Sequence, residues 1–267
     1  MSSGMRRLIV GSKEDDASLT MFRHFVEARG PEEVGDGLYA DSSFVYMLVE
    51  RRHIYCDNVD KDPRLSGEAF KDVVFLSRHS SSAQIKSLTV HPTGNFGPAD
   101  LGGRERTVSV SDPGYMLPTL KELREAYSGN GYEITFEATH HGPYMETPNF
   151  YIEIGTTPED WHRPEVLDAV LRAVESAHQC SGPTFIGVGG GHYMPKITEY
   201  AVENGIPVGH MVSKHSLAVT DRSGILEAIR KTPGCRGILV DRKGVKSEGK
   251  AIVSAVADEL GMETVII

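Results

Sequence analysis

Short runs of apolar residues, many of them β-branched, alternate along the chain with segments in which apolar residues recur every three to four positions. The first pattern is typical of buried strands, and the second of helices that bury one face. The runs predict strands over residues 8–11, 44–50, 73–77, 87–90, 132–139, 150–154, 184–188, 207–212, 237–240 and 264–267. The periodicity predicts helices over residues 17–28, 117–127, 164–178, 195–204, 223–231 and 250–260.

The order of these elements predicts an α/β protein. Strands dominate the first half, strands and helices alternate in the second, and several strands are apolar along almost their whole length, as in sheets covered on both faces. We therefore expect a three-layer α/β/α sandwich with a mixed sheet, formed by residues 1–267 as one domain. One long segment, residues 91–118, contains four prolines and five glycines and predicts a loop. A loop of this length in a compact domain is commonly functional.

The charge balance limits the class of partner. The 267 residues carry a formal net charge of −9, which argues against a protein that coats nucleic acid with its whole surface. Residues 231–250 nevertheless hold six Lys or Arg against two acids, and Arg104 and Arg106 add a second basic group. Such clusters are typical of phosphate contact, although a solvated surface loop is the alternative.

The three cysteines are widely spaced and form no CxxC pair, so we expect reduced thiols rather than disulfides. The N-terminus has too short an apolar run for a signal peptide, and no stretch approaches the roughly 18–20 apolar residues of a membrane helix. We expect a cytoplasmic protein without a membrane partner.

Histidines fall where predicted strands end. If the strands are parallel, their carboxyl ends meet at one edge of the sheet, and the imidazoles converge on one cleft. Imidazole and carboxylate are zinc ligands, and a zinc site with an open position supports hydrolysis. The histidines are His79, His91, His140, His141, His192 and His210, and the nearby carboxylates are Glu137, Glu146 and Glu153.

A histidine at a strand end is more often simply solvated or hydrogen-bonded, and His24, His53, His162 and His178 are placed in that class. No HExxH or other standard zinc spacing is present.

A glycine-rich segment, residues 187–195, joins a predicted strand to a predicted helix. Its glycines, Gly189 to Gly191, allow backbone amides to approach an anion or a developing oxyanion. It matches neither a Walker A loop nor GxGxxG. A tight turn is the alternative interpretation.

Together these motifs resemble the archaeal and plant type of D-aminoacyl-tRNA deacylase. The resemblance spans about residues 70–215 and keeps the order of the family's motifs. It rests on Ser77-Arg78-His79-Ser80-Ser81, His91-Pro92-Thr93-Gly94-Asn95-Phe96-Gly97, Glu137-Ala138-Thr139-His140-His141-Gly142-Pro143, Phe150-Tyr151-Ile152-Glu153-Ile154-Gly155 with Trp161, and Gly189-Gly190-Gly191-His192-Tyr193-Met194-Pro195 with Gly209-His210.

The resemblance implies a phosphorylase/hydrolase-like α/β/α fold and a zinc-dependent hydrolase, with one or two Zn²⁺ ions. The expected reaction cleaves the ester between a D-amino acid, for example D-tyrosine, and tRNA. The expected partner is the acceptor end of the aminoacyl-tRNA, and the protein is expected to be a monomer.

The resemblance and the motifs together give a hypothesis for each site residue. The expected metal ligands are a subset of His79, His140, His141, Glu153, His192 and His210. The expected catalytic residues are His140 and His141, with Glu146 or Glu137 as base. Substrate binding is expected at His91, Asn95, Gly189, Gly190, Gly191 and Tyr193, with the loop after His91 closing over the terminal adenosine. Contact with tRNA is expected at Arg104, Arg106, Arg242, Lys243 and Lys246.

Two other functions remain open from the sequence. A zinc-dependent amidohydrolase or peptidase would act on small amides without tRNA. A non-catalytic tRNA-binding protein with a structural metal would bind tRNA without cleaving the ester.

Overall fold

The computed structural model describes residues 5–79, 84–127, 129, 131–155 and 157–267. Its largest element is an eight-stranded mixed sheet. In spatial order its strands are β2 (Glu32–Gly35), β3 (Leu38–Ala40), β4 (Phe44–Val49), β1 (Arg7–Ser12), β5 (Asp72–Arg78), β10 (Asn149–Gly155), β6 (Ser87–His91) and β9 (Glu133–Phe136). Strands β4, β1, β5 and β10 are parallel to one another, whereas β6 and β9 run antiparallel to β10.

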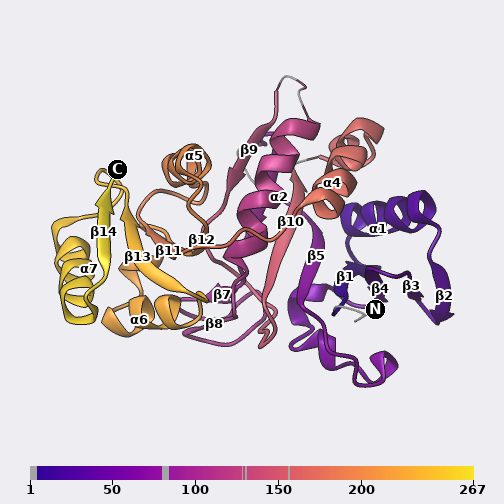
Figure 1. Cartoon of the computed structure of the whole chain (residues 1–267), viewed down its shortest axis with the longest axis horizontal. Coiled ribbons are helices and arrows are strands. Elements are labelled where there is room, and N and C mark those ends of the chain that lie inside the picture. The colour runs from indigo at the N-terminus through magenta and orange to yellow at the C-terminus, as the bar shows by residue number, and fades with distance from the viewer. Residues whose placement is uncertain (1–4, 80–83, 128, 130, 156) are drawn as a thin grey trace.

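A second, all-parallel sheet lies at the other end of the molecule (Figure 1). Its strands, in order, are β12 (Val208–Val212), β11 (Thr184–Val188), β13 (Cys235–Val240) and β14 (Glu263–Ile266). A short ribbon of β7 (Gly94–Asn95) and β8 (Thr107–Val108) lies between the two sheets. The α/β class and the mixed sheet are thus confirmed, but β11 to β14 form their own sheet instead of extending the first.

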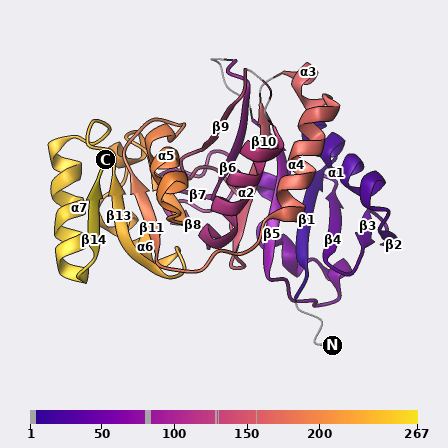
Figure 2. The same ribbon diagram turned by 45° about the horizontal axis from the view of Figure 1, so that its top comes forward.

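The helices cover the sheets unequally. Helices α1 (Asp16–Arg29), α2 (Pro113–Ala126) and α4 (Pro164–Ser176), with the short α3 (Pro158–Trp161), pack together against the large sheet (Figure 2). Helices α5 (Pro195–Asn204), α6 (Arg222–Arg230) and α7 (Ser247–Leu260) accompany the small sheet. None of the helices in the described part of the chain is both long enough and apolar enough to cross a membrane.

The two faces of the large sheet differ in what buries them. Along β10, Phe150, Ile152 and Ile154 join the core under the helices, because alternate side chains of a strand point to the same face. Tyr151 and Glu153 therefore point to the opposite face. There the covering layer is the segment 53–65, with three single-turn 3-10 helices, His53–Tyr55, Val59–Lys61 and Pro63–Leu65, rather than a layer of α-helices.

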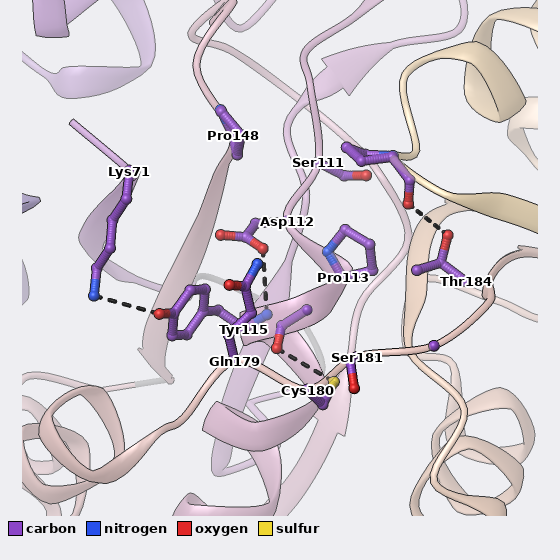
Figure 3. Close-up of a pocket in the computed structure, with 13 residues that line it drawn as sticks. Lys71, Ser111, Asp112, Pro113, Tyr115, Pro148, Gln179, Cys180, Ser181 and Thr184 are labelled. Carbon is purple, nitrogen blue, oxygen red and sulfur yellow. Dashed lines mark hydrogen bonds between the residues drawn. The ribbon is translucent and has the colours of Figure 1, made fainter. Parts of the chain in front are cut away.

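Every predicted helix and strand has a counterpart, with differences at some ends. The predicted strand 132–139 ends at Phe136, and the predicted loop 91–118 ends at Asp112, whose carboxylate caps α2. Pro118 therefore lies inside α2, where it cannot donate to the Gly114 carbonyl. That carbonyl instead accepts hydrogen bonds from the amide and thiol of Cys180, at 3.0 and 3.3 Å (Figure 3). The proline is tolerated because the linker to the small sheet satisfies the carbonyl that it leaves free.

Candidate active site

Seven ionisable side chains from both sheets converge on the face of the large sheet that carries Tyr151. We call them the histidine–carboxylate cluster, and its members are His79, His91, His140, His141, His192, Glu137 and Glu153. Both carboxylates are buried, as are His79 and His91, whereas the side chain of His192 is 43% exposed. His192 therefore marks the mouth of the cluster.

The large sheet positions the buried half of the cluster. His91 ends β6 directly opposite Tyr151 of β10, and Glu153 lies two residues further along the same face. The sequence predicts that the carboxyl ends of these strands share one edge of the sheet. The carboxyl ends of β6 and β9 do not share an edge with that of β5, because both strands run antiparallel to β10. The side chains meet on a face of the sheet instead.

A turn after β9 brings two adjacent histidines to the same place. His141 has a left-handed backbone, with φ of 42°, an uncommon conformation for a residue other than glycine. The rings of His140 and His141 consequently lie 4.3 Å apart, and each lies within 5.0 Å of the His91 ring, measured between centroids. Glu137 and His141 do not lie on one strand, because β9 has already ended at Phe136.

The glycine-rich loop after β11 brings the last histidine. His192 Nε2 lies 3.0 Å from Glu137 Oε2, and the same carboxylate lies 3.0 Å from His79 Nδ1 through its other oxygen. Backbone hydrogen bonds join this loop to β9, since the amide of Ala138 donates to the His192 carbonyl at 2.8 Å. The small sheet thus completes a site that the large sheet begins.

Three histidines are oriented in the same way. The Nδ1 atoms of His91, His140 and His141 donate to backbone carbonyls at 3.2, 2.8 and 2.7 Å, because a carbonyl can only accept. Each ring therefore turns its Nε2 atom toward the cluster. This arrangement, with one nitrogen on a carbonyl and the other free, is typical of metal-binding histidines.

Several buried atoms at the centre have no hydrogen bond within the described structure. They are His91 Nε2 and both carboxylate oxygens of Glu137. The two 3.0 Å approaches to Glu137 are close in distance, but neither has hydrogen-bond geometry. Buried polar atoms without partners are costly, so these donors fit a cation held between them.

The possible ligand atoms form overlapping triads. The potential donor atoms of His91, His140 and His141 lie within 4.8 Å of one another, and so do those of His79, Glu137 and His192. A third triad joins His91 to both carboxylates. Nitrogen and carboxylate oxygen at such spacings suit zinc.

The electrostatics of the cluster keep its carboxylates charged. Burial raises the pKa of Glu137, but His192 and His79 outweigh it and hold that pKa below its ordinary value. Burial lowers the pKa of His79, but Glu137 and Glu153 outweigh it and raise the pKa to about 11. Burial, with the neighbouring His91, keeps the pKa of His140 well below its ordinary value. His140 is therefore a neutral imidazole, which is the form that binds a metal.

Two aromatic hydroxyl groups hold the cluster from outside. Tyr193 Oη hydrogen bonds with His79 Nε2 at 2.9 Å. Tyr151 stacks on the His91 ring, with 5.1 Å between centroids, and its hydroxyl hydrogen bonds with His53 Nδ1 at 3.0 Å. His53 was expected among the hydrogen-bonded histidines, and this is confirmed, because its Nε2 also hydrogen bonds with the Leu76 carbonyl at 3.0 Å. The contact of Tyr151 with the cluster was not predicted, although the i, i+2 spacing of Tyr151 and Glu153 places both on one face.

Two expected site residues lie elsewhere. His210 is buried with both ring nitrogens hydrogen bonded, Nδ1 with Thr139 Oγ1 at 3.0 Å and Nε2 with the Ser109 carbonyl at 2.9 Å, so no nitrogen is free for a metal. Glu146 is exposed and forms an ion pair with Lys61. The expectation that Glu146 acts as a base near the histidines is therefore wrong.

Three expected substrate-binding groups have other contacts. Asn95 is buried, and its side-chain amide donates to the carbonyls of Gly102 and Arg104 at 2.9 and 3.3 Å, so it shapes the loop. The amide of Gly189 donates to the Val212 carbonyl at 2.8 Å and cannot bind an oxyanion. His91, expected to contact substrate, belongs to the cluster itself.

The glycine-rich loop packs against the basic segment. A Cβ added to Gly244 would lie 2.1 Å from the nitrogen of Gly190, so the two loops touch through their backbones. Arg242 and Lys243 lie in this second loop, which ends at Lys246, before α7. Arg106 lies in the loop after β7, and its amide donates to the Gly97 carbonyl at 2.9 Å. Two residues of the motif Ser77-Arg78-His79-Ser80-Ser81, namely Ser80 and Ser81, lie outside the described residues.

Comparisons with known proteins identify the family of the chain. A family model described as D-aminoacyl-tRNA deacylase matches residues 66–265. Proteins named D-aminoacyl-tRNA deacylase from Thermoplasma acidophilum and Thermococcus kodakarensis are 45% and 32% identical to the chain. The first match covers 97% of this chain and 99% of the relative, and the second 96% and 98%. A crystal structure of a conserved protein of unknown function, AF0625, aligns with a TM-score of 0.90 at 31% identity, over 98% of this chain and 95% of that one. The chain therefore belongs to the D-aminoacyl-tRNA deacylase family.

Proposed function

We propose that the protein hydrolyses the ester that joins a D-amino acid to the terminal ribose of tRNA. The products are the free D-amino acid and a tRNA that can be charged again, so the reaction removes wrongly charged tRNA. The observation that carries the proposal is the histidine–carboxylate cluster, in a chain whose relatives are named for this reaction. The acceptor end of the tRNA is the part that must reach the cluster, and we expect the enzyme to act in the cytoplasm as a monomer.

Zinc is the metal that the donor set supports. The Nε2 atoms of His91, His140 and His141 would hold one ion, whereas the second set, His79, Glu137 and His192, is used for proton transfer. Bound zinc would polarise the ester carbonyl and make a water molecule more acidic. Glu153 lies between the two sets, with carboxylate oxygens 3.3 Å from His79 Nδ1 and 3.5 Å from His91 Nε2.

We assign the proton transfer to Glu137. As water adds to the ester carbonyl carbon, Glu137 Oε2 accepts the proton that the water loses. His192 Nε2 lies 3.0 Å from this oxygen and is the most exposed cluster member, so it passes the proton to the ribose oxygen as the C–O bond breaks. Tyr193 positions His79 behind this pair through its 2.9 Å hydrogen bond.

Tyrosyl-tRNA of both chiralities tests the proposal directly. We expect the purified protein to release D-tyrosine from D-Tyr-tRNA and to leave L-Tyr-tRNA intact over the same period. Release of neither amino acid would favour a binding protein, and cleavage of small amides without tRNA would favour an amidohydrolase. Equal release of both would remove the chiral selectivity from the proposal.

A further inference from the structure

Three segments meet in a tight junction directly outside the cluster, namely residues 53–56, 101–104 and 141–144. The amide of Gly142, the residue after His141, donates to the Leu101 carbonyl at 3.0 Å. A Cβ at Gly142 would lie 2.3 Å from the Ile54 carbonyl oxygen, and one at Gly102 would lie 1.9 Å from the same atom. The backbones therefore touch with no space between them, and whatever the junction displays outward has a fixed position relative to His141.

The outer surface of this junction exposes an aromatic ring. Tyr55 is 45% exposed and Leu101 beside it is 51% exposed. Among the described residues, Tyr55 is the most exposed Phe, Tyr or Trp. A Cβ at Gly102 would lie 3.2 Å from the Tyr55 ring, which places that ring against the loop. An exposed ring held by glycine backbone offers a flat face on which a nucleic-acid base can stack.

Positive charge lies on the same junction. The Arg104 guanidinium lies 3.8 Å from the centroid of the Tyr144 ring, and the Arg104 side chain is 51% exposed. Lys231 Nζ approaches the hydroxyl of the same tyrosine at 3.4 Å and makes no ion pair among the described residues. Asp57 lies 3.6 Å from Arg104, so the arginine retains one acidic neighbour. An arginine fixed on a ring beside an exposed aromatic is suited to contact a phosphate next to a stacked base.

We propose that this junction binds the unpaired 3′ end of the tRNA, with a base stacked on Tyr55 and a backbone phosphate against Arg104. The inference rests on the proposed function, because only a substrate esterified at the 3′ end brings its last nucleotides beside the cluster. The ester and the terminal base belong to one nucleoside, so the base must lie at the rim of the site. The junction, which includes His141, provides an exposed aromatic ring.

Binding of uncharged tRNA with an intact or a trimmed 3′ end tests the stacking contact. Trimming the terminal nucleotides should weaken binding to the unaltered protein by roughly five- to a hundredfold, which is the range for loss of one stacked base. Tyr55→Ala should weaken binding of the intact tRNA by a similar factor and should show a smaller further loss on trimming, because only the phosphate contact to Arg104 is then left to lose. Tyr55→Phe should behave as the unaltered protein. Val34→Ala, at a comparably exposed apolar position in β2, is the matched control.

Two binding results would overturn this inference. If Tyr55→Ala loses as much affinity on trimming as the unaltered protein does, the 3′ end does not contact Tyr55. If trimming has no effect on the unaltered protein, the junction does not bind the 3′ end. Failure of the unaltered protein to hydrolyse D-Tyr-tRNA would overturn the proposed function itself. Normal hydrolysis together with either of these two binding results would overturn only this inference.

Salt dependence tests the phosphate contact. Arg104→Ala should weaken binding of intact tRNA and lower the slope of log affinity against log salt by about one. Arg104→Lys should restore most of that slope, since the charge remains. Arg23→Ala, an exposed arginine of α1, should leave the slope unchanged. An unchanged slope for Arg104→Ala would show that Arg104 does not contact a phosphate.

Discussion

Two groups of buried ionisable side chains lie against the large sheet, and they differ in how their polar atoms are satisfied. At the amino ends of the strands, Asp72 accepts hydrogen bonds from Arg7 Nε and Nη2 at 2.6 and 2.9 Å, and Arg7 Nη1 donates to the Val174 carbonyl at 3.0 Å. Asp112, beside them, caps α2 by accepting from the amide of Tyr115 (Figure 3). In the histidine–carboxylate cluster, Glu137 and His91 keep buried atoms without hydrogen bonds. The first group satisfies its polar atoms within the protein, whereas the second leaves buried polar atoms without hydrogen bonds.

Of the tests of this difference, removal of metal should have the largest effect. Dialysis against a chelator should reduce deacylation to background, and added zinc should restore it, because the cluster lacks other partners for its donor atoms. The midpoint of thermal unfolding should also fall, since an ion that binds only the folded state stabilises it. Full activity with no zinc detected by mass spectrometry would show that the cluster works without a metal.

Glu137→Gln should separate activity from stability. Loss of the proton acceptor should lower kcat for D-Tyr-tRNA by about 10²–10⁴. Stability should fall, but by less than in Asp72→Asn, because Glu153 still pairs with the buried His79 when residue 137 carries no charge. Glu146→Gln is the matched control, an exposed carboxylate paired with Lys61, and its kcat should stay within about twofold of the unaltered value. Large destabilisation by Glu137→Gln with little loss of kcat would make Glu137 a structural residue like Asp72.

Asp72→Asn should show the opposite pattern. It leaves the buried Arg7 guanidinium without a counter-ion, which costs about 3–5 kcal/mol in the free energy of unfolding. Activity per folded molecule should be retained, and denaturant titration beside active-site titration measures both. Replacing both partners, Arg7→Met with Asp72→Leu, should recover much of the stability. A double variant as unstable as the single one would mean that the pair itself, rather than its imbalance, stabilises the fold.

The pH dependence of stability provides the smallest test. Burial, with the neighbouring Asp72 carboxylate, raises the pKa of Asp112 to about 7. The folded protein therefore holds this proton more tightly than the unfolded chain does. The stability that protonated Asp112 contributes is present at acid pH and is lost as pH rises through about 7. Asp112→Asn keeps a cap for α2 but cannot titrate.

We expect the stability of the unaltered protein, relative to Asp112→Asn, to fall by at most about 1.4 kcal/mol per pH unit between pH 4 and pH 7. Parallel stability curves for the two proteins would contradict the assignment.

Local patterns predicted the elements well, because hydrophobic periodicity reports which face is buried. Strand direction leaves no such trace, so the antiparallel β6 and β9, and hence convergence on a face rather than an edge, were not predicted. The strand-end histidines indicated the right segments. What they could not indicate was the contact partner of each ring. His210 and His91 are equally buried and occupy similar places in the sequence pattern, yet only His91 keeps a nitrogen free.

The contact between the two sheets has a consequence for the order of folding. Most of the cluster comes from the large sheet, but His192 follows β11, and the amides of Ala138 and Met194 link its loop to β9 in both directions, at 2.8 and 3.0 Å. A chain emerging from the ribosome can therefore form the large sheet well before it can assemble an active centre. We therefore expect activity only once the later sheet has docked, so that an incompletely folded molecule does not expose a reactive centre to other esters in the cell.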